Sequence, residues 1–265
     1  MENKCIIRFM ILYQFDNSFE GILTALFDAY SRKRFPDRLL GSQEMPPLFY
    51  EELYCVHTDM EKAERVWKAI QKKLSRTAVN WVIKCWLSEE EGTGNLLFHF
   101  LHKVVAASRS IETNFTDPHV AAVMQLGKKV GGEQLRVMQF MRFQKTADGI
   151  YWGAMEPIYN VLPLTVMHFR DRFSDQPWII YDNRRQYGYY YNLKEIDEIT
   201  FSSPSAPLLQ AHRLDEEWLD KDEKLFQELW KSYFNSICIR ERLNPVKHKK
   251  DMPVRYWKYL TEKQD

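Results

Sequence analysis

The spacing of apolar residues divides the chain into a helical middle with strands before and after it. A buried strand is expected at residues 5–13, and a helix follows it because apolar positions recur every three or four residues at Phe19, Ile22, Leu23, Leu26, Phe27 and Tyr30. The segment "ELYCVHT" at 52–58 predicts a second strand. Four helices are expected between about 59 and 137, and the Gly131–Gly132 pair predicts the end of the last one.

The pattern changes to strands beyond these glycines. The segment 135–157 predicts strand, turn and strand, with Asp148–Gly149 in the turn. A short helix at 160–173, a hairpin at 178–192 and a further strand at 196–201 follow. A long helix is expected over 215–243, since its apolar residues form one helical stripe at Phe226, Leu229, Trp230, Tyr233, Phe234 and Ile237, which is expected to face the core.

This order of elements predicts an α+β fold. We expect a central helical block, a long C-terminal helix, and a mixed or antiparallel sheet to which strands of both the N-terminal and the C-terminal half contribute. The chain is expected to form a single domain over 1–265, with a possible division into 1–135 and 136–265. The sequence has no Gly/Ser-rich linker and no internal repeat.

Composition confines any nucleic-acid surface to a local patch. The 265 residues are 45% hydrophobic and carry a net charge of only +1, which excludes a uniformly basic protein. Between 226 and 260, however, eight Lys and Arg residues face three acids, with Tyr256, Trp257 and Tyr259 among them. Cations bind phosphates and aromatic rings stack on unpaired bases, so this segment suits nucleic acid. The alternative is a solvated tail that its aromatic residues anchor to the fold.

Metal and cofactor chemistry find little support in the sequence. The four cysteines are far apart, without the spacing of zinc or iron–sulfur ligands, and the glycines of "GKKVGGE" lack the lysine of a phosphate-binding loop. We therefore expect no metal and no cofactor in this chain, and reduced, mostly buried thiols in a cytoplasmic protein. No stretch approaches about 20 apolar residues, so no membrane span is expected.

Several polar residues are candidates for a functional site. His168 and Arg172 lie four residues apart on the short helix and share a face, so that Arg172 can hold a phosphate while His168 donates or moves a proton. Arg142 is expected on the outer face of a strand, and Arg184 and Arg185 at the turn of the hairpin. Each of these also has a purely structural interpretation, as a satisfied polar residue or one half of an ion pair.

The hairpin is rich in tyrosine. Because side chains alternate along a strand, Tyr181, Tyr189 and Tyr191 are expected on one face and Tyr190 on the other. These rings either brace the sheet or provide a surface on which bases stack.

Four segments carry a resemblance to a known family. They are "FDNSFEGIL", "MRFQ", "EPIYNVLPLTVMHFRDRFSDQPWIIYDNRRQYGYYY" and "ELWKSYFNSICIRERLNPVKHKKDMPVRYWKYLTE". Together they resemble a bacterial family of unknown mechanism that is associated with DNA metabolism and DNA repair. The resemblance implies a separate radical S-adenosylmethionine (radical SAM) protein as partner, which would hold the iron–sulfur cluster. Some relatives carry a fused uracil-DNA glycosylase-like domain, and this chain looks like the stand-alone form.

Three functions follow as hypotheses. The first is a DNA-binding accessory protein in repair, acting with the radical SAM enzyme. The second is an enzyme in which His168 and Asp182 transfer protons on a nucleotide or damaged base. The third is a protein–protein adaptor, because Tyr, Trp and Arg dominate interfaces. Residues of the resembling motifs, among them Asn160 and Tyr181, are candidates, and for nucleic-acid contact we select Arg142, Arg172, Arg184, Arg185, Tyr187, Arg240, Arg242, Arg255 and Trp257.

Overall fold

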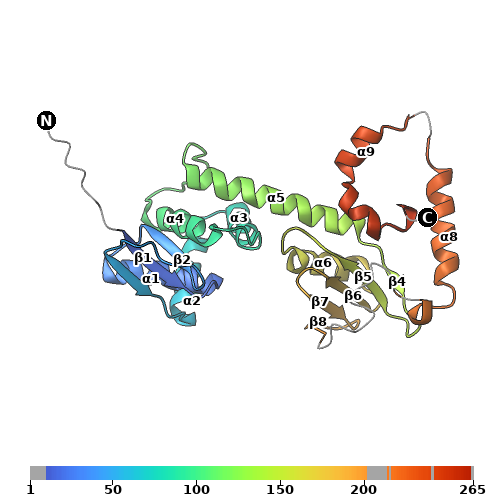
Figure 1. The fold of residues 1–265 in the computed structure, drawn as a ribbon, viewed down its shortest axis with the longest axis horizontal. Coiled ribbons are helices and arrows are strands. Elements are labelled where there is room, and N and C mark those ends of the chain that lie inside the picture. The colour runs from blue at the N-terminus through green and yellow to red at the C-terminus, as the bar shows by residue number, and fades with distance from the viewer. Residues whose placement is uncertain (1–9, 202–213, 215, 240–241, 264–265) are drawn as a thin grey trace. The chain divides into compact units, whose positions relative to one another are not determined.

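The chain forms two compact units. The computed structural model describes residues 10–201, 214, 216–239 and 242–263 (Figure 1). The N-terminal unit comprises residues 1–131 and the C-terminal unit residues 132–265. The division falls within one long helix, α5 (Pro118–Phe140), four residues before the division suggested by the sequence.

The N-terminal unit packs helices onto a small parallel sheet. Its strands are β1 (Ile11–Phe15), β2 (Arg38–Gly41) and β3 (Glu52–Cys55), in the order β2-β1-β3 with both pairings parallel. Helix α1 (Phe19–Arg32) connects the first two strands. The expected four-helix region is confirmed as α2 (Met60–Lys73), α3 (Arg76–Trp86), α4 (Thr93–Ala106) and α5.

Local sequence signals explain where these helices begin. The Ser18 hydroxyl accepts a hydrogen bond from the Gly21 amide and caps α1, and the Asp59 carboxylate accepts from the Glu61 and Lys62 amides and caps α2. The apolar faces of the helices close over the sheet in one core, in which Tyr13, Ile22, Leu26, Val82, Leu97, Leu101 and Val123 are each fully buried.

Helix α5 does not end at Gly131–Gly132 as the sequence predicts. It continues to Phe140, and its buried residues Val130, Glu133, Val137 and Phe140 keep a helical spacing across the glycine pair. Glycine destabilises a helix by only about 1 kcal/mol relative to alanine. The packing of the next two turns therefore outweighs the low helix propensity of the two glycines. The strand expected from residue 135 is therefore largely helix, and only Gln144–Lys145 (β4) is extended.

The C-terminal unit contains a five-stranded mixed sheet in the order β4-β5-β6-β7-β8. The strands after β4 are β5 (Tyr151–Met155), β6 (Trp178–Asp182), β7 (Tyr187–Tyr191) and β8 (Ile196–Ile199). The predicted turn at Asp148–Gly149 joins β4 and β5 and is confirmed, with Gly149 at a φ of +84°. Helix α6 (Leu162–Arg172) makes the crossover between the parallel strands β5 and β6.

The hairpin β6–β7 pairs its strands in a register that changes the expected faces of its tyrosines. Asp182 pairs with Tyr187 across the turn, so Tyr181 lies opposite Gly188 and Trp178 lies opposite Tyr191. Tyr181 therefore shares a face with Tyr190, and the prediction that it lies with Tyr189 and Tyr191 is wrong. Counting by two works within one strand, but across a turn the pairing register decides.

The fold class is confirmed as α+β, with two differences in its details. Among the residues that the structure describes, the strands of the two halves do not join, because β1–β3 and β4–β8 form separate sheets. The long C-terminal helix is represented by α8 (Glu223–Ser236) among the described residues. A short helix, α9 (Pro245–Asp251), and two 3-10 helices, η3 (Val254–Tyr259) and η4 (Thr261–Lys263), follow it.

Two further expectations concern the membrane and the cysteines. In the described part of the chain, no helix combines the length and the apolar character needed to cross a bilayer. Cys85 is buried, as expected, but Cys55 and Cys238 are exposed. Cys55 ends β3 and Cys238 follows α8, positions where the chain leaves its packed elements.

Gly188 tests the packing of the hairpin. A Cβ atom at this position would collide with the Ile180 carbonyl oxygen and the Tyr181 ring, and backbone cannot move aside as a flexible side chain can. We expect Gly188→Ala to lower the free energy of unfolding by roughly 1–3 kcal/mol, measured by thermal and urea unfolding of the full chain.

Gly132→Ala is the matched control, because an added Cβ there meets no atom within 4 Å. It is expected to leave stability unchanged or to raise it by up to about 1 kcal/mol. An unchanged midpoint in Gly188→Ala would contradict the register described for β6 and β7.

Candidate nucleic-acid interface

The loop after β5 gathers arginines from distant parts of the C-terminal unit. The Arg184 guanidinium donates to the Ile158 carbonyl at 3.0 Å. Arg185 donates to the carbonyls of Pro157 at 3.2 Å and Ile158 at 3.1 Å. The turn of the hairpin is therefore fastened to residues 157–158.

A buried glutamate brings two more arginines to the same loop. Glu133 of α5 is 1% exposed, and its Oε1 accepts a hydrogen bond from the Ile158 amide at 2.9 Å. Its Oε2 lies 2.5 Å from the Arg255 guanidinium of η3 and 3.5 Å from that of Arg136. The Ile158 peptide thus lies between the hairpin arginines on its carbonyl side and the Glu133 ion pairs on its amide side.

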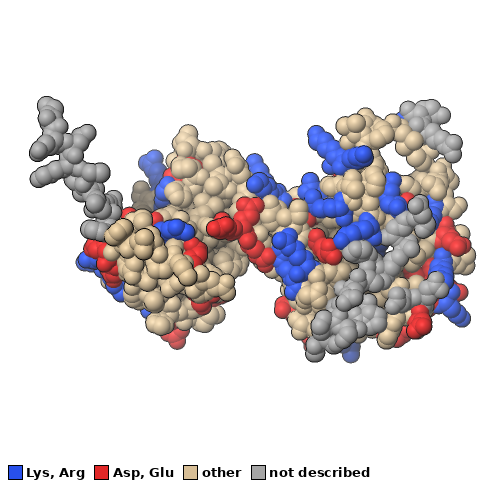
Figure 2. Space-filling view, in the orientation of Figure 1, with Lys and Arg blue, Asp and Glu red and all other residues tan. Residues whose placement is uncertain are grey.

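We call this group of cations the loop cluster. Lys258 completes it through an ion pair with Glu156 at 2.6 Å. The cations come from α5, the β6–β7 turn and η3, and they are Arg136, Arg184, Arg185, Arg255 and Lys258. In Figure 2, Lys and Arg side chains gather on the visible face of the C-terminal unit, over the region of α9 and η3 in Figure 1.

Asp182 organises the turn from inside the protein. It is fully buried, and Oδ1 accepts hydrogen bonds from the amides of Arg184 at 2.9 Å and Arg185 at 3.1 Å. Oδ2 accepts from the Arg185 guanidinium at 2.9 Å. Burial raises the pKa of Asp182, and the hydrogen bonds from Arg185 and Arg184 oppose that shift.

The proposed pairing of His168 with Asp182 gains no support from this arrangement. Both oxygens of Asp182 already accept hydrogen bonds, whereas the His168 ring contacts Phe169 edge-on, with the ring centroids 5.4 Å apart. In the part of the chain that the structure describes, no hydrogen bond or ion pair joins His168 to Asp182. Proton transfer between them would require such a contact, directly or through one water.

The remaining candidates lie around the hairpin and near α9. The Tyr187 hydroxyl donates to Asn160, and burial raises the pKa of Tyr187. The Trp257 indole donates to the Met252 carbonyl at 3.0 Å and anchors the end of α9 to η3. Arg242 is exposed, with no ion pair to any described residue. Arg240 lies outside the described residues.

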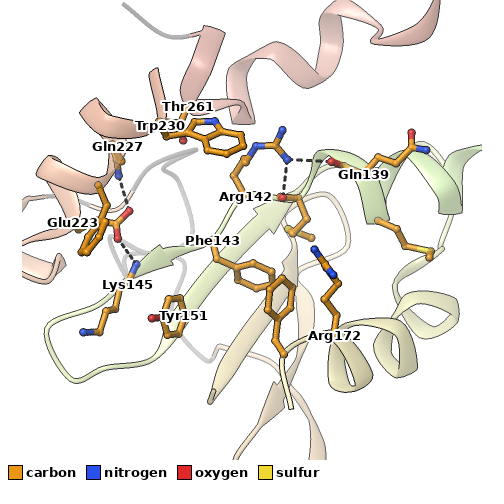
Figure 3. Close-up of a pocket in the computed structure, with 14 residues that line it drawn as sticks. Gln139, Arg142, Phe143, Lys145, Tyr151, Arg172, Glu223, Gln227, Trp230 and Thr261 are labelled. Atoms are coloured by element: carbon orange, nitrogen blue, oxygen red, sulfur yellow. Dashed lines mark hydrogen bonds between the residues drawn. The ribbon is translucent and has the colours of Figure 1, made fainter. Parts of the chain in front are cut away.

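A second feature of the C-terminal unit is a cleft of about 810 Å³, shown in Figure 3. The end of α5, β4, β5 and the end of α6 line it on one side, and α8 with Thr261 lines it on the other. We call it the aromatic cleft, because five rings line it together with three cations: Phe143, Tyr151, Phe173, Phe226 and Trp230, with Arg142, Lys145 and Arg172.

Arg142 is fixed at the cleft by a buried acid. Its Nη2 lies 2.7 Å from Oε1 of Glu262, whose side chain is 1% exposed, and its guanidinium carbon is 5.8 Å from the centroid of the Trp230 ring. The Trp230 indole donates to the same carboxylate at 2.9 Å. Burial favours a raised pKa for Glu262, but the hydrogen bonds from Arg142 and Trp230 outweigh it and hold that pKa below its usual range.

The other charges of the cleft differ in how they are paired. Arg172 is exposed and has no carboxylate partner among the described residues. Lys145 reaches Asp220 at 3.2 Å. Glu223 is buried, and its carboxylate accepts hydrogen bonds from the Lys145 amide at 3.1 Å and the Gln227 side chain at 3.0 Å.

The structure therefore sorts the candidate residues into two places. Arg142 and Arg172 line the aromatic cleft, whereas Arg184, Arg185 and Arg255 belong to the loop cluster. Sequence reasoning missed most of the rings of the cleft and assigned Phe226 and Trp230 to a buried stripe, although they are 62% and 40% exposed. Helical spacing identifies a shared face but not whether the core or a cleft faces it.

Comparison with known proteins gives one result. A family model described as a domain of unknown function, DUF4130, matches residues 91–262. The chain belongs to the DUF4130 family. The match includes every residue of the loop cluster and of the aromatic cleft, so both features lie in the part that defines the family. No curated protein and no solved structure matches the chain.

Replacement of Glu262 by glutamine tests the anchor of Arg142. The pKa of Glu262 is lowered in the folded protein, so its stabilising effect is present above the ordinary glutamate pKa and is lost as the pH falls through the lower, folded value. We expect Glu262→Gln to cost roughly 1–3 kcal/mol at pH 7, measured by urea unfolding.

The difference in the free energy of unfolding between Glu262→Gln and the native protein should become smaller as the pH is lowered below the ordinary glutamate pKa of about 4.3. The matched control is Glu64→Gln, since Glu64 is exposed and pairs with Lys68 on the surface of α2. A difference that is constant between pH 7 and pH 3 would show that the charge of Glu262 does not stabilise the fold.

Proposed function

We propose that this protein is a DNA-binding accessory protein in DNA repair or DNA metabolism. The observation that carries the proposal is the loop cluster, in which cations from three separated segments converge on residues 156–158 and on Glu133, which binds the Ile158 amide. A phosphate backbone is the polyanion that such a group of cations suits, since each guanidinium offers several N–H donors in one plane.

Two of the three acids of the loop cluster are buried. Glu133 and Asp182 are at most 1% exposed, whereas the side chains of Arg136, Arg255 and Lys258 are 38–39% exposed, and Glu156, the partner of Lys258, is 38% exposed. The carboxylates hold the guanidinium groups from beneath and leave their outer edges facing solvent. Arg185, at 12%, is mainly a structural anchor of the turn.

Helix α9 extends this basic surface along the chain. Lys247, Lys249 and Lys250 are exposed and have no ion pair with any described residue, and Asp251 is the one acid of the helix. Trp257 and His248 pack together and connect α9 to η3, which carries Arg255 and Lys258. About four phosphate contacts are within the capacity of α9 and the loop cluster.

The accessory role rests on the family resemblance given above. That resemblance supports a separate radical SAM enzyme as the partner that performs the chemistry. The contribution of this chain would then be to hold DNA.

DNA binding can be measured by fluorescence anisotropy with single-stranded and double-stranded oligonucleotides. With about four phosphate contacts, log affinity should fall against log salt with a slope between about −3 and −4. Arg184→Ala and the double variant Lys249→Ala/Lys250→Ala should each weaken binding and make the slope shallower by about 0.7–0.9 per contact removed.

Lys194→Ala is the matched control. Lys194 is equally exposed but lies in the β7–β8 turn, at the end of β7 away from Arg184. Its binding constant should stay within about twofold of the native value. Undetectable binding of both DNA forms at low salt would reject the proposed function.

A second candidate function is that of a protein adaptor, which the outer face of α8 favours. Leu225, Leu229 and Tyr233 are each 55% exposed, and Ile237, just beyond the helix, is 56% exposed. Apolar surface of this kind is typical of a protein interface. The stripe expected to be buried is thus largely exposed in the described part of the chain.

The two functions make different predictions for a pull-down with the radical SAM enzyme. If the chain is an adaptor, nuclease treatment should leave the complex intact, and Leu229→Lys should reduce the captured enzyme several-fold because it puts a charge in an apolar contact. Lys224→Ala, on the same helix, serves as control. If capture of the enzyme depends on added DNA and Leu229→Lys does not affect it, the adaptor function is rejected and DNA binding is supported.

A further inference from the structure

We propose that the aromatic cleft binds one unstacked nucleotide of a DNA strand, with the base between the rings and the adjacent phosphate at Arg172. The inference rests on the proposed function, because it assumes that the chain holds DNA. It assigns to the cleft a task distinct from that of the loop cluster, since the cleft would recognise a base while the loop cluster and α9 hold the backbone.

The size of the cleft suits a single small group. Its volume of about 810 Å³ lies within the range of roughly 300–1,000 Å³ that is typical of small-molecule sites. A duplex cannot enter a space of this size, so the nucleotide must be unpaired or turned out of its helix.

The rings stand on two sides of the space. Phe143, just before β4, and Tyr151 of β5 lie on one side, and Trp230 of α8 lies across from them (Figure 3). Phe226 precedes Trp230 by one turn of α8 and also lines the cleft. A planar base placed between these sides stacks on aromatic surface, a contact that tolerates any of the four bases. Glu262 holds the planar Arg142 guanidinium beside Trp230, so that a cation lies next to this ring of the cleft.

Polar groups are available at the edges of such a base. The Gln227 side chain donates to Glu223, so its amide oxygen is left to accept an N–H of the base. Thr261 and Gln139 also line the cleft. A purely apolar guest, such as a leucine-rich peptide, would leave these groups without partners.

The charges favour an anionic guest. Three cations and one acid line the cleft, and Arg172 is the cation without a carboxylate partner among the described residues. Arg172 is also exposed, at the end of α6. A phosphate next to the bound base would be an anionic partner for the Arg172 guanidinium, whereas an uncharged peptide would not.

The test uses the full chain and single-stranded 12-mers with one 2-aminopurine, a base whose fluorescence reports its stacking. Phe226→Ala and Arg172→Ala each remove an exposed side chain of the cleft, so neither should disturb the fold. The controls are their neighbours Leu225→Ala, 55% exposed on α8, and Arg170→Ala, which removes the partner of Asp171 on α6. Neither control residue lines the cleft.

We expect the native protein to change the emission of 2-aminopurine on binding. Phe226→Ala should abolish that change and weaken binding roughly 5- to 100-fold, as expected for loss of one base–ring contact. Arg172→Ala should weaken binding and make the salt slope shallower by about 0.7. Leu225→Ala and Arg170→Ala should behave as the native protein does.

Two results would overturn the inference in distinguishable ways. If the native protein binds the strands but both cleft variants match their controls, the cleft does not hold a base, and the proposed function stands without it. The same conclusion follows if a strand in which abasic sites replace every base binds as tightly as the intact strand. If the native protein binds no DNA, the proposed function and this inference fail together.

Discussion

The C-terminal unit depends on two ion pairs that join the end of α5 to the C-terminal segment. Arg142 pairs with Glu262, 120 residues later, and Glu133 pairs with Arg255, 122 residues later. In each pair the carboxylate is 1% exposed, so solvent cannot stabilise its charge and an arginine inside the protein must do so. Losing one partner of a fully buried pair typically costs about 3–5 kcal/mol, whereas replacing both by apolar residues is often neutral. The arginines of these two pairs are 24% and 38% exposed, so the cost here is expected to be smaller. The pairs therefore specify a geometry more than they add stability.

That geometry builds both candidate surfaces from the same segments. Glu262 orients Arg142 and Trp230 together, and these two side chains form one end of the aromatic cleft. Glu133 orients Arg255 and the Ile158 amide, and the carbonyl of Ile158 then receives the arginines of the hairpin. Because a few carboxylates are buried while their arginine partners reach the surface, a chain with a net charge of +1 has a locally basic surface.

Sequence reasoning recovered what local spacing determines. The α+β class, the four consecutive helices, the turn at Gly149 and the hairpin all follow from periodicity and turn residues. It failed where a distant partner decides. Packing of Val137 and Phe140 carries α5 past two glycines, and the register across residues 183–186 sets the faces of the tyrosines. Residue type selected Arg142 and Arg172 as candidates, but the rings around them were not predicted. Nothing in a single sequence distinguishes a ring that lines a cleft from one that fills a core.

The hairpin turn carries a consequence for how this family can vary. Four residues separate Asp182 from its pairing partner Tyr187, and this number places Trp178 and Tyr191 on the same side of the sheet. One inserted or deleted residue would turn the aromatic side chains of β7 over, moving buried rings into water. The number of residues between Asp182 and Tyr187 is therefore constrained, as is the Arg185 side chain that pairs with buried Asp182 inside the turn.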